Sequence, residues 1–339
     1  MTAHIKVVAL VLAGILSCQG VTAPPPETEP PVEVETAAPA ELPEELESTM
    51  IYPGWLPLSC TKVPDDEDRG TILNDEVPGH DEFPHTFTVY LPPYYDPQRQ
   101  YDLLIFLGPD GGQNGDCIVR YHSTWYTEIF RFRTIFDNLI LEKRVKPFIM
   151  VQPDYREWKD LQFDYDAVAR NIKEEFLPYV ADNYGTYAYD GSYESLVAAR
   201  DHIIMGGCSL GGKYTLGGLM PNCLDVCANF LPMSSNMSVA AARDRVLELS
   251  QLYPIKKLIY TVGGIEEMQQ KMLPDHLMNM YSEILTDQNF HVIEIEGTHH
   301  HYSTWGAGLW NSLQYILRDD VVFPPPEPTY PPEETDTVQ

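Results

Sequence analysis

Short apolar segments alternate with segments of helical periodicity over most of the chain, and this alternation limits its possible folds more than any other feature. The expected strands are 86–91, 103–107, 148–151, 202–205, 229–233, 257–262 and 291–295. The expected helices between and after them are 168–180, a segment after Gly211, 240–252, 267–286 and a last helix ending near Leu317. Strands that are separated by helices pair in parallel, and such a sheet is covered by helices on both faces. We therefore expect an α/β fold with a mostly parallel central sheet.

The N-terminal end of the chain differs from this alternating region. Lys6 precedes an apolar run, 7–16, that is too short to span a bilayer and is typical of a signal peptide. The run ends in Ile15-Leu16-Ser17-Cys18, which is similar to a bacterial lipobox, where the cysteine becomes the lipid-modified first residue. The alternative is ordinary cleavage near Gly20 or Ala23. No later segment has the length and apolar character of a membrane span.

Segments rich in Pro and Glu flank the alternating region. We predict a signal peptide at 1–18, a linker at 19–50, one folded domain at 51–321 and a disordered tail at 322–339. The chain carries 22 basic and 50 acidic residues, for a net charge of −28, which argues against a nucleic-acid partner. We expect a secreted protein on the bacterial cell surface that meets the membrane only through a lipid anchor.

A candidate nucleophile follows the expected strand at 202–205. The segment Gly207-Cys208-Ser209-Leu210-Gly211 matches the pattern G-x-S-x-G, and a helix-compatible segment, 213–219, comes next. A tight strand-to-helix turn of this kind lifts a serine hydroxyl above the sheet, and its glycines avoid collisions with neighbouring backbone. The backbone N–H of Leu210, at the start of the helix, is suited to binding an oxyanion. We predict that Ser209 is a nucleophile.

A serine nucleophile needs a base and an acid, which follow it along the chain in the order acid, then histidine. The base is expected after the last strand, in Gly297-Thr298-His299-His300-His301. Three adjacent histidines also suggest a metal site, but neighbouring side chains on an extended loop point in different directions. We therefore expect no metal and no cofactor. The acid is expected in Gly263-Gly264-Ile265-Glu266-Glu267, although acidic residues also favour the start of a helix, and Asp275 is a further candidate.

Two C-terminal segments, 300–305 (HHYSTW) and 308–313 (GLWNSL), resemble the signature of the feruloyl esterase branch of the family-one carbohydrate esterases. The resemblance covers about residues 87–317 and implies an α/β-hydrolase fold. Aligned on Trp305, it implies that His300 is the base. The family's G-T-x-D turn is matched by 263–266, which implies that Glu266 is the acid in place of the usual Asp.

One segment departs from the family pattern. Where the family usually has H-G-x-G-G, this chain has Gly108-Pro109-Asp110-Gly111-Gly112. The histidine is lost and Pro109 replaces the first glycine, but the glycine turn survives. The backbone N–H of Asp110 is therefore expected to face the oxyanion together with that of Leu210.

The resemblance implies a serine esterase that forms an acyl-enzyme on plant cell-wall polysaccharide, with feruloyl esters of arabinoxylan as the first choice. Acetylxylan deacetylation, acyl transfer and non-catalytic carbohydrate binding are the alternatives. Trp305, Trp125 and Gln113 are expected to contact the substrate, and the two tryptophan rings are suited to stacking on a planar phenolic acyl group. The competing interpretation is that these tryptophans pack in the core or bind the sugar.

The cysteines leave the disulfide pattern open. A secreted protein can form disulfides. Cys208 with Cys227 and Cys60 with Cys117 are two possible pairs, but spacing alone determines neither.

The lipobox-like segment predicts that the mature protein begins at a lipid-modified Cys18. Mass spectrometry of the natively expressed protein should find a diacylated N-terminal cysteine, because two acyl chains hold a protein stably on a membrane. A Cys18→Ala variant should be released from the membrane fraction. A mature N-terminus beyond Cys18 that carries no lipid would refute the anchor.

Overall fold

The computed structural model describes residues 62–78, 85–109, 132–154, 164–236 and 240–318, together with the backbone of a short strand, β1 (Ala38–Pro39). The chain divides into a unit at 1–36 and a unit at 37–339, and the fold described below belongs to the second. The predicted signal peptide and C-terminal tail, and all of the predicted linker except β1, lie outside the described residues. β1 pairs in parallel with β4 (Arg99–Gln100).

An eight-stranded sheet organises the described residues, in the order β10-β9-β8-β7-β5-β6-β3-β2. Its strands are β2 (Thr71–Val77), β3 (His85–Leu91), β5 (Asp102–Leu107), β6 (Phe148–Pro153), β7 (Ile203–Cys208), β8 (Asn229–Met233), β9 (Lys257–Gly263) and β10 (Phe290–Ile295). The strands from β5 to β10 pair in parallel, whereas β3 is antiparallel to both β6 and β2. The mostly parallel sheet predicted from the sequence is confirmed.

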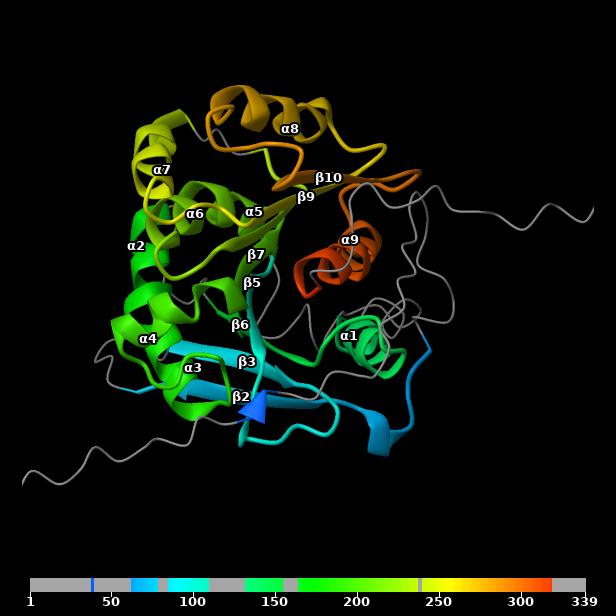
Figure 1. The fold of residues 1–339 in the computed structure, drawn as a ribbon. Helices are drawn as coiled ribbons and strands as arrows, with labels where there is room; N and C mark the ends of the chain where they lie inside the picture. The colour runs from blue at the N-terminus through cyan, green and yellow to red at the C-terminus, as the bar shows by residue number, and fades with distance from the viewer. Residues whose placement is uncertain are drawn as a thin grey trace, which may run out of the picture. The chain divides into compact units, whose positions relative to one another are not determined.

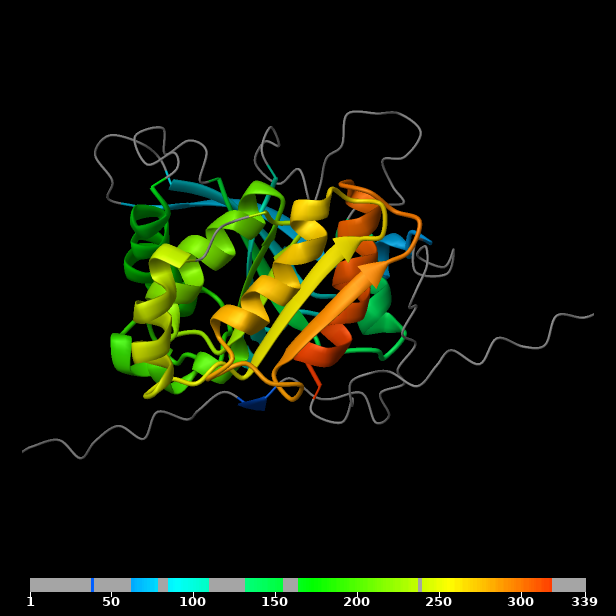
Figure 2. The ribbon, with the colours of Figure 1, turned by 90° about the horizontal axis from the view of Figure 1, so that it is seen from above.

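Helices cover both faces of this sheet, as Figures 1 and 2 show. One face carries α1 (Phe132–Leu141) and α9 (Tyr302–Ile316). The other carries α2 (Tyr165–Asn171), α3 (Leu177–Asn183), α4 (Tyr193–Ala198), α5 (Leu210–Tyr214), α6 (Met220–Cys223), α7 (Arg243–Ser250) and α8 (Met268–Met280). The two hydrophobic cores therefore lie on opposite sides of the sheet.

The central strand β5 shows why its sequence is apolar throughout. Leu103, Ile105 and Leu107 enter the core under α2 to α8, while Leu104 and Phe106 enter the core under α1 and α9. Side chains alternate between the two faces of a strand, so a strand covered on both faces needs apolar residues at every position.

Helices α1 and α4 were not predicted from the sequence, and three further elements differ from the prediction. The predicted helix at 168–180 is interrupted by a π-helical turn, Ile172–Phe176, before Pro178 takes an early position in α3, where its missing N–H costs little. The predicted helix at 267–286 ends at Met280. The edge strand β2 was not predicted, because its sequence, TILNDEV, is largely exposed and polar.

The cysteine pair Cys208–Cys227 is not formed: both residues, with Cys223, are buried thiols. Cys208 ends β7, where it lies opposite Met233, whereas Cys227 precedes the start of the parallel strand β8. The two sulfur atoms are therefore held near opposite ends of neighbouring strands. Burial raises the pKa of Cys227 to about 12. Cys60 and Cys117 lie outside the described residues.

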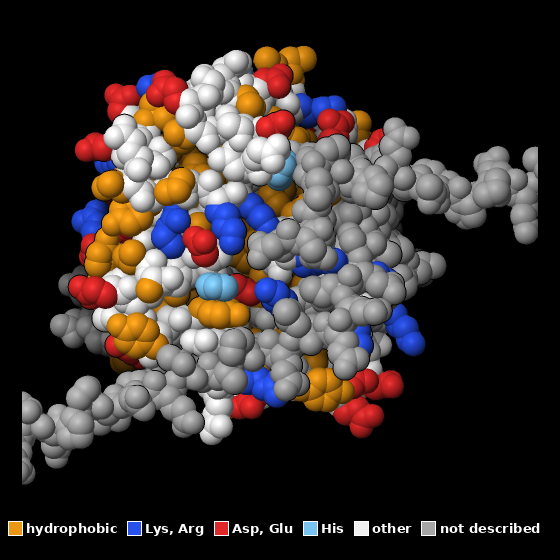
Figure 3. Space-filling view, in the orientation of Figure 1, with side chains coloured by type: hydrophobic (Ala, Val, Ile, Leu, Met, Phe, Trp, Pro, Cys, Tyr) orange, Lys and Arg blue, Asp and Glu red, His pale blue; other side chains and the backbone are white. Residues whose placement is uncertain are grey.

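Acidic and basic side chains are mixed over the described part of the face seen in Figure 3. Surface ion pairs join separate elements, for example Arg243 to Glu283 at 2.9 Å and Arg245 to Asp166 at 3.0 Å. None of the helices in the described ranges combines the length and the apolar character that a membrane crossing requires.

The turn between β7 and α5 brings the backbone of α5 close to the end of the neighbouring strand β5. A Cβ atom on Gly211 would lie 2.0 Å from the carbonyl oxygen of Leu107, and one on Gly207 would lie 2.7 Å from the same oxygen. Neither position can hold a larger residue without moving backbone. The sequence-based explanation for these glycines is confirmed.

Gly211→Ala should therefore destabilise the protein more than an alanine at an unobstructed glycine. We expect a loss of about 3 kcal/mol or more in the free energy of unfolding, because the clash is with backbone and cannot be relieved by a side-chain rotation. Gly297→Ala is the matched control: nothing lies within 4 Å of the added carbon, and only its positive φ of 71° opposes the change. Its cost should be about 1 kcal/mol. Equal losses in urea denaturation would contradict the steric explanation.

Candidate active site

Ser209 occupies the tip of the turn between β7 and α5. Its backbone has φ 56° and ψ −114°, a conformation that non-glycine residues rarely adopt. The Ser209 N–H donates to the carbonyl of Met233 at 3.0 Å, and the Ser209 carbonyl accepts from Lys213 N at 3.2 Å. These contacts tie the strained residue to β8 and to the helix. Strain of this kind persists only where the surroundings enforce it, and it is common at functional sites.

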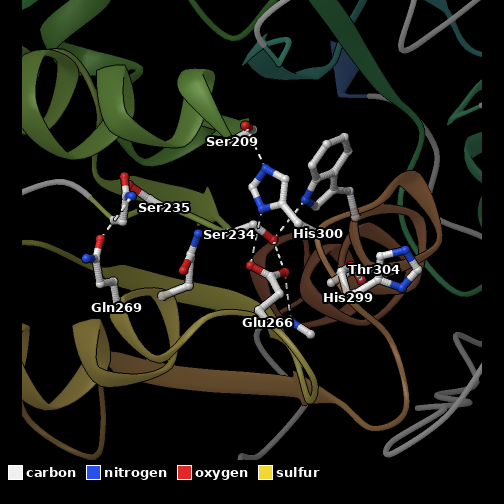
Figure 4. A network of polar contacts seen from close by, with 12 residues as sticks. Ser209, Ser234, Ser235, Glu266, Gln269, His299, His300 and Thr304 are labelled. Carbon is white, nitrogen blue, oxygen red and sulfur yellow. Dashed lines mark hydrogen bonds and ion pairs between the residues drawn. The ribbon is translucent and has the colours of Figure 1, made fainter.

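The structure brings together the three side chains that the sequence singled out (Figure 4). His300 Nε2 lies 2.8 Å from Ser209 Oγ, and His300 Nδ1 lies 3.3 Å from Glu266 Oε2. Each residue follows the carboxyl end of a parallel strand: Ser209 follows β7, Glu266 follows β9 and His300 follows β10. The carboxyl ends of parallel strands meet at one edge of a sheet, which is why residues 91 positions apart become neighbours.

Only the middle one of the three adjacent histidines contacts Ser209. The His299 and His301 rings stack with their centroids 5.6 Å apart, and His301 Nδ1 accepts from Ser303 N at the start of α9. Burial, with a smaller contribution from His299, lowers the pKa of His301. No group of three or more His, Cys, Asp or Glu side chains suited to a metal ion occurs within the described ranges.

The acid is likewise distinguished from its neighbours. The Glu266 side chain is fully buried beside His300. Glu267 is exposed and takes the N-cap position of α8, which is the role that a helix start offers to an acidic residue. Asp275 is exposed on the same helix.

This arrangement can perform nucleophilic chemistry at a carbonyl. His300 Nε2 is placed to accept the Ser209 proton, and Glu266 is placed to accept the hydrogen of Nδ1. Leu210, the first residue of α5, has a backbone N–H with no acceptor inside the helix, so it is available to an oxyanion at Ser209.

The sequence matches no protein-family model. The endo-1,4-beta-xylanase Y of Acetivibrio thermocellus is 31% identical over 256 residues, which are 69% of this chain and 22% of that protein. The chain thus spans about a fifth of the length of that relative.

Two solved structures share the fold. A feruloyl esterase module from Clostridium thermocellum, solved as a mutant complexed with sinapinate, has a TM-score of 0.66 at 20% identity and covers 81% of this chain and 96% of its own. A ferulic acid esterase from the anaerobic fungus Anaeromyces mucronatus, in complex with ferulic acid, has a TM-score of 0.57 at 16% identity and covers 80% of this chain and 97% of its own.

This chain has the fold of the feruloyl esterases. The resemblance expected from residues 300–313 is confirmed. The α/β-hydrolase fold places its nucleophile on a strand-to-helix turn, which is where Ser209 lies.

Within this feruloyl esterase fold, Trp305 does not lie where the sequence analysis placed it. We expected its ring to line the substrate cleft, but the residue is only 4% exposed. Its ring packs edge-on against His300, with centroids 5.3 Å apart, and its indole Nε1 donates to Ser234 Oγ at 2.8 Å. These contacts favour the competing interpretation, in which Trp305 packs in the core, because the start of α9 turns this side chain inward.

Four other predicted residues lie outside the described ranges: Cys18, Asp110, Gln113 and Trp125. Their lipidation, oxyanion and substrate roles stay predictions. Conversely, Ser234 contacts both Glu266 and Trp305 but was not singled out from the sequence. A serine after a strand carries no signal of its own, so only the folded structure identifies it.

Substitutions in this cluster should affect ester hydrolysis very unequally. Ser209→Ala should lower kcat for a chromogenic acyl ester on the order of 10⁴- to 10⁶-fold, because the nucleophile is lost. His300→Ala should cause a similar loss, since the serine then lacks its base. His299→Ala and His301→Ala are the matched controls and should be much milder. If His300→Ala is the mildest of the three, the base is misassigned.

Proposed function

We propose that this chain is a serine carboxylesterase that removes ester-linked acyl groups from plant cell-wall polysaccharide, with feruloyl esters of arabinoxylan as its main substrates. The observation that carries the proposal is the 2.8 Å contact between His300 Nε2 and Ser209 Oγ at a strained strand-to-helix turn. A spectator serine would need neither the strain nor a histidine that is itself backed by a buried glutamate.

The reaction proceeds through an acyl-enzyme. Ser209 Oγ attacks the ester carbonyl while His300 Nε2 takes its proton, and the backbone N–H of Leu210 binds the oxygen that becomes negative. When the intermediate collapses, His300 returns the proton to the sugar hydroxyl that leaves. A water molecule then attacks the acyl-enzyme with the same base, which releases the carboxylic acid and restores Ser209.

The proteins that this chain resembles support a hydroxycinnamoyl substrate. One was solved with sinapinate and another with ferulic acid, and a relative at 31% identity is an endo-1,4-beta-xylanase. These ligands are planar phenolic acids, so a site that accepts them needs more room than an acetyl group requires. The non-catalytic alternative rested on the altered segment at 108–112, and the assembled Ser209, His300 and Glu266 weigh against it.

We also propose that the enzyme works outside the cell. A cell-wall polysaccharide is too large to be imported whole, so its deacylation requires an exported enzyme. The signal-peptide-like run at 7–16, Cys18 and the Pro- and Glu-rich linker at 19–50 fit an esterase held at the cell surface on a spacer.

Substrate preference tests this proposal. We expect kcat/KM for methyl ferulate to exceed that for a short-chain acetyl ester and for acetylated xylan, because stacking on Trp125, which stays a predicted substrate contact, would add about 0.5–1.5 kcal/mol beyond area burial. Ser209→Ala serves as the background control in each assay. A clear preference for the acetyl substrates would reassign the enzyme as an acetylxylan esterase, and turnover of none of them would refute an esterase.

A further inference from the structure

Glu266 is held at one carboxylate oxygen and presents the other to His300. Its Oε1 accepts from Ser234 Oγ at 2.5 Å and from the backbone N–H of Gly263 at 3.0 Å, whereas Oε2 faces His300 Nδ1 at 3.3 Å. With the side chain fully buried, water does not compete for either oxygen. The two donors on Oε1 therefore determine how the carboxylate is turned toward the histidine.

The donor on the far side of Ser234 sets the direction of these hydrogen bonds. Trp305 Nε1 lies 2.8 Å from Ser234 Oγ, and an indole N–H can only donate. Ser234 Oγ must accept this bond, so its own hydrogen is directed to Glu266, which as a carboxylate only accepts. With Oε1 occupied by two donors, Oε2 is the oxygen left to accept from Nδ1 of His300, and Nε2 is left to accept from Ser209.

The backbone holds Ser234 in place for this contact. Ser234 has a φ of 50° and its N–H donates to the Thr261 carbonyl at 2.8 Å. Tyr260 Oη accepts from Ser235 N at 3.1 Å and lies 2.7 Å from the Ser235 carbonyl. Burial, reinforced by the charge of Glu266, raises the pKa of Tyr260 well above its usual range, so it keeps its proton. The end of β8 is thus fastened to β9, the strand that leads to Glu266.

We propose that Ser234 is a positioning residue of the catalytic site, and that Trp305 acts through it. Together they orient the Glu266 carboxylate and fix the tautomer of His300 that can deprotonate Ser209. This inference rests on the proposed function, because it concerns how the same three residues are prepared for catalysis. It also gives a role to the indole of Trp305, a residue that is only 4% exposed.

The hydroxyl and the backbone conformation of Ser234 can be tested separately. Ser234→Ala and Ser234→Gly both remove the hydroxyl, but glycine also relieves the positive φ. We expect both to lower kcat on the order of 10- to 100-fold with KM nearly unchanged, because a hydrogen bond to a charged group is lost without touching substrate. If the serine mattered only for its conformation, the glycine variant would keep wild-type kcat. The glycine variant should also keep the wild-type Tm, so a folding failure of Ser234→Ala would not obscure the result.

The indole N–H is tested by a double-mutant cycle. Trp305→Phe keeps an aromatic ring but removes the donor, and it should lower kcat roughly 3- to 10-fold in the wild-type background. In the Ser234→Gly background it should have little further effect, because its only route to Glu266 is gone. Ser312→Ala is the matched control: its hydroxyl is equally buried on α9 but lies 3.4 Å from Thr261 Oγ1 rather than near the carboxylate. This control should keep wild-type kcat.

Two results would overturn the inference. One is a wild-type kcat in Ser234→Gly, and the other is that the effects of Trp305→Phe and Ser234→Gly on kcat are fully additive. Ser209→Ala is assayed in the same series to separate the two proposals. If Ser209→Ala is inactive while the Ser234 variants match the wild type, the positioning role alone fails. If Ser209→Ala keeps wild-type activity, the proposed function fails instead.

Discussion

The contact between the backbone of α5 and the end of β5 is the constraint on which the rest of the site depends. Gly211 approaches the Leu107 carbonyl so closely that no side chain fits between them. That approach makes the turn after β7 tight enough to force Ser209 into a positive φ, which lifts its hydroxyl clear of the sheet. The same turn exposes the first N–H groups of α5 beside the hydroxyl. The positions of the Ser209 hydroxyl and of the free N–H groups of α5 are thus consequences of one packing contact.

Parallel pairing of the strands then places the remaining side chains of the site next to one another. β7, β8, β9 and β10 are consecutive neighbours in the sheet, and each contributes from its carboxyl end. Ser209, Ser234, Glu266 and His300 come from these four ends in order. Because every strand points the same way, short loops suffice to bring the side chains into contact, and the sheet beneath them is covered by hydrophobic cores on both faces.

The sequence predicted what depends on local pattern and missed what depends on contacts between distant segments. The buried strands could be predicted because apolar runs such as Leu103 to Leu107 have few alternatives. The edge strand β2 could not, since its largely exposed residues mix polar and apolar side chains without a continuous apolar run. At the site, order along the chain and resemblance indicated Glu266 and His300, which the structure brings to Ser209. The inward turn of Trp305 and its contact with Ser234 arise from how α9 packs on β8 and β9, which no single segment encodes.

The donor-only character of the Trp305 indole has a consequence for where a proton can go. A chain of hydroxyls and carboxylates can pass a proton in either direction, but an indole N–H cannot receive one. The line of hydrogen bonds from Glu266 through Ser234 therefore ends at Trp305, a group that cannot accept a proton. A proton taken up by His300 therefore finds no acceptor at the inner end of this line of hydrogen bonds. The open side of the imidazole, which is 40% exposed and faces Ser209, is where such a proton can leave.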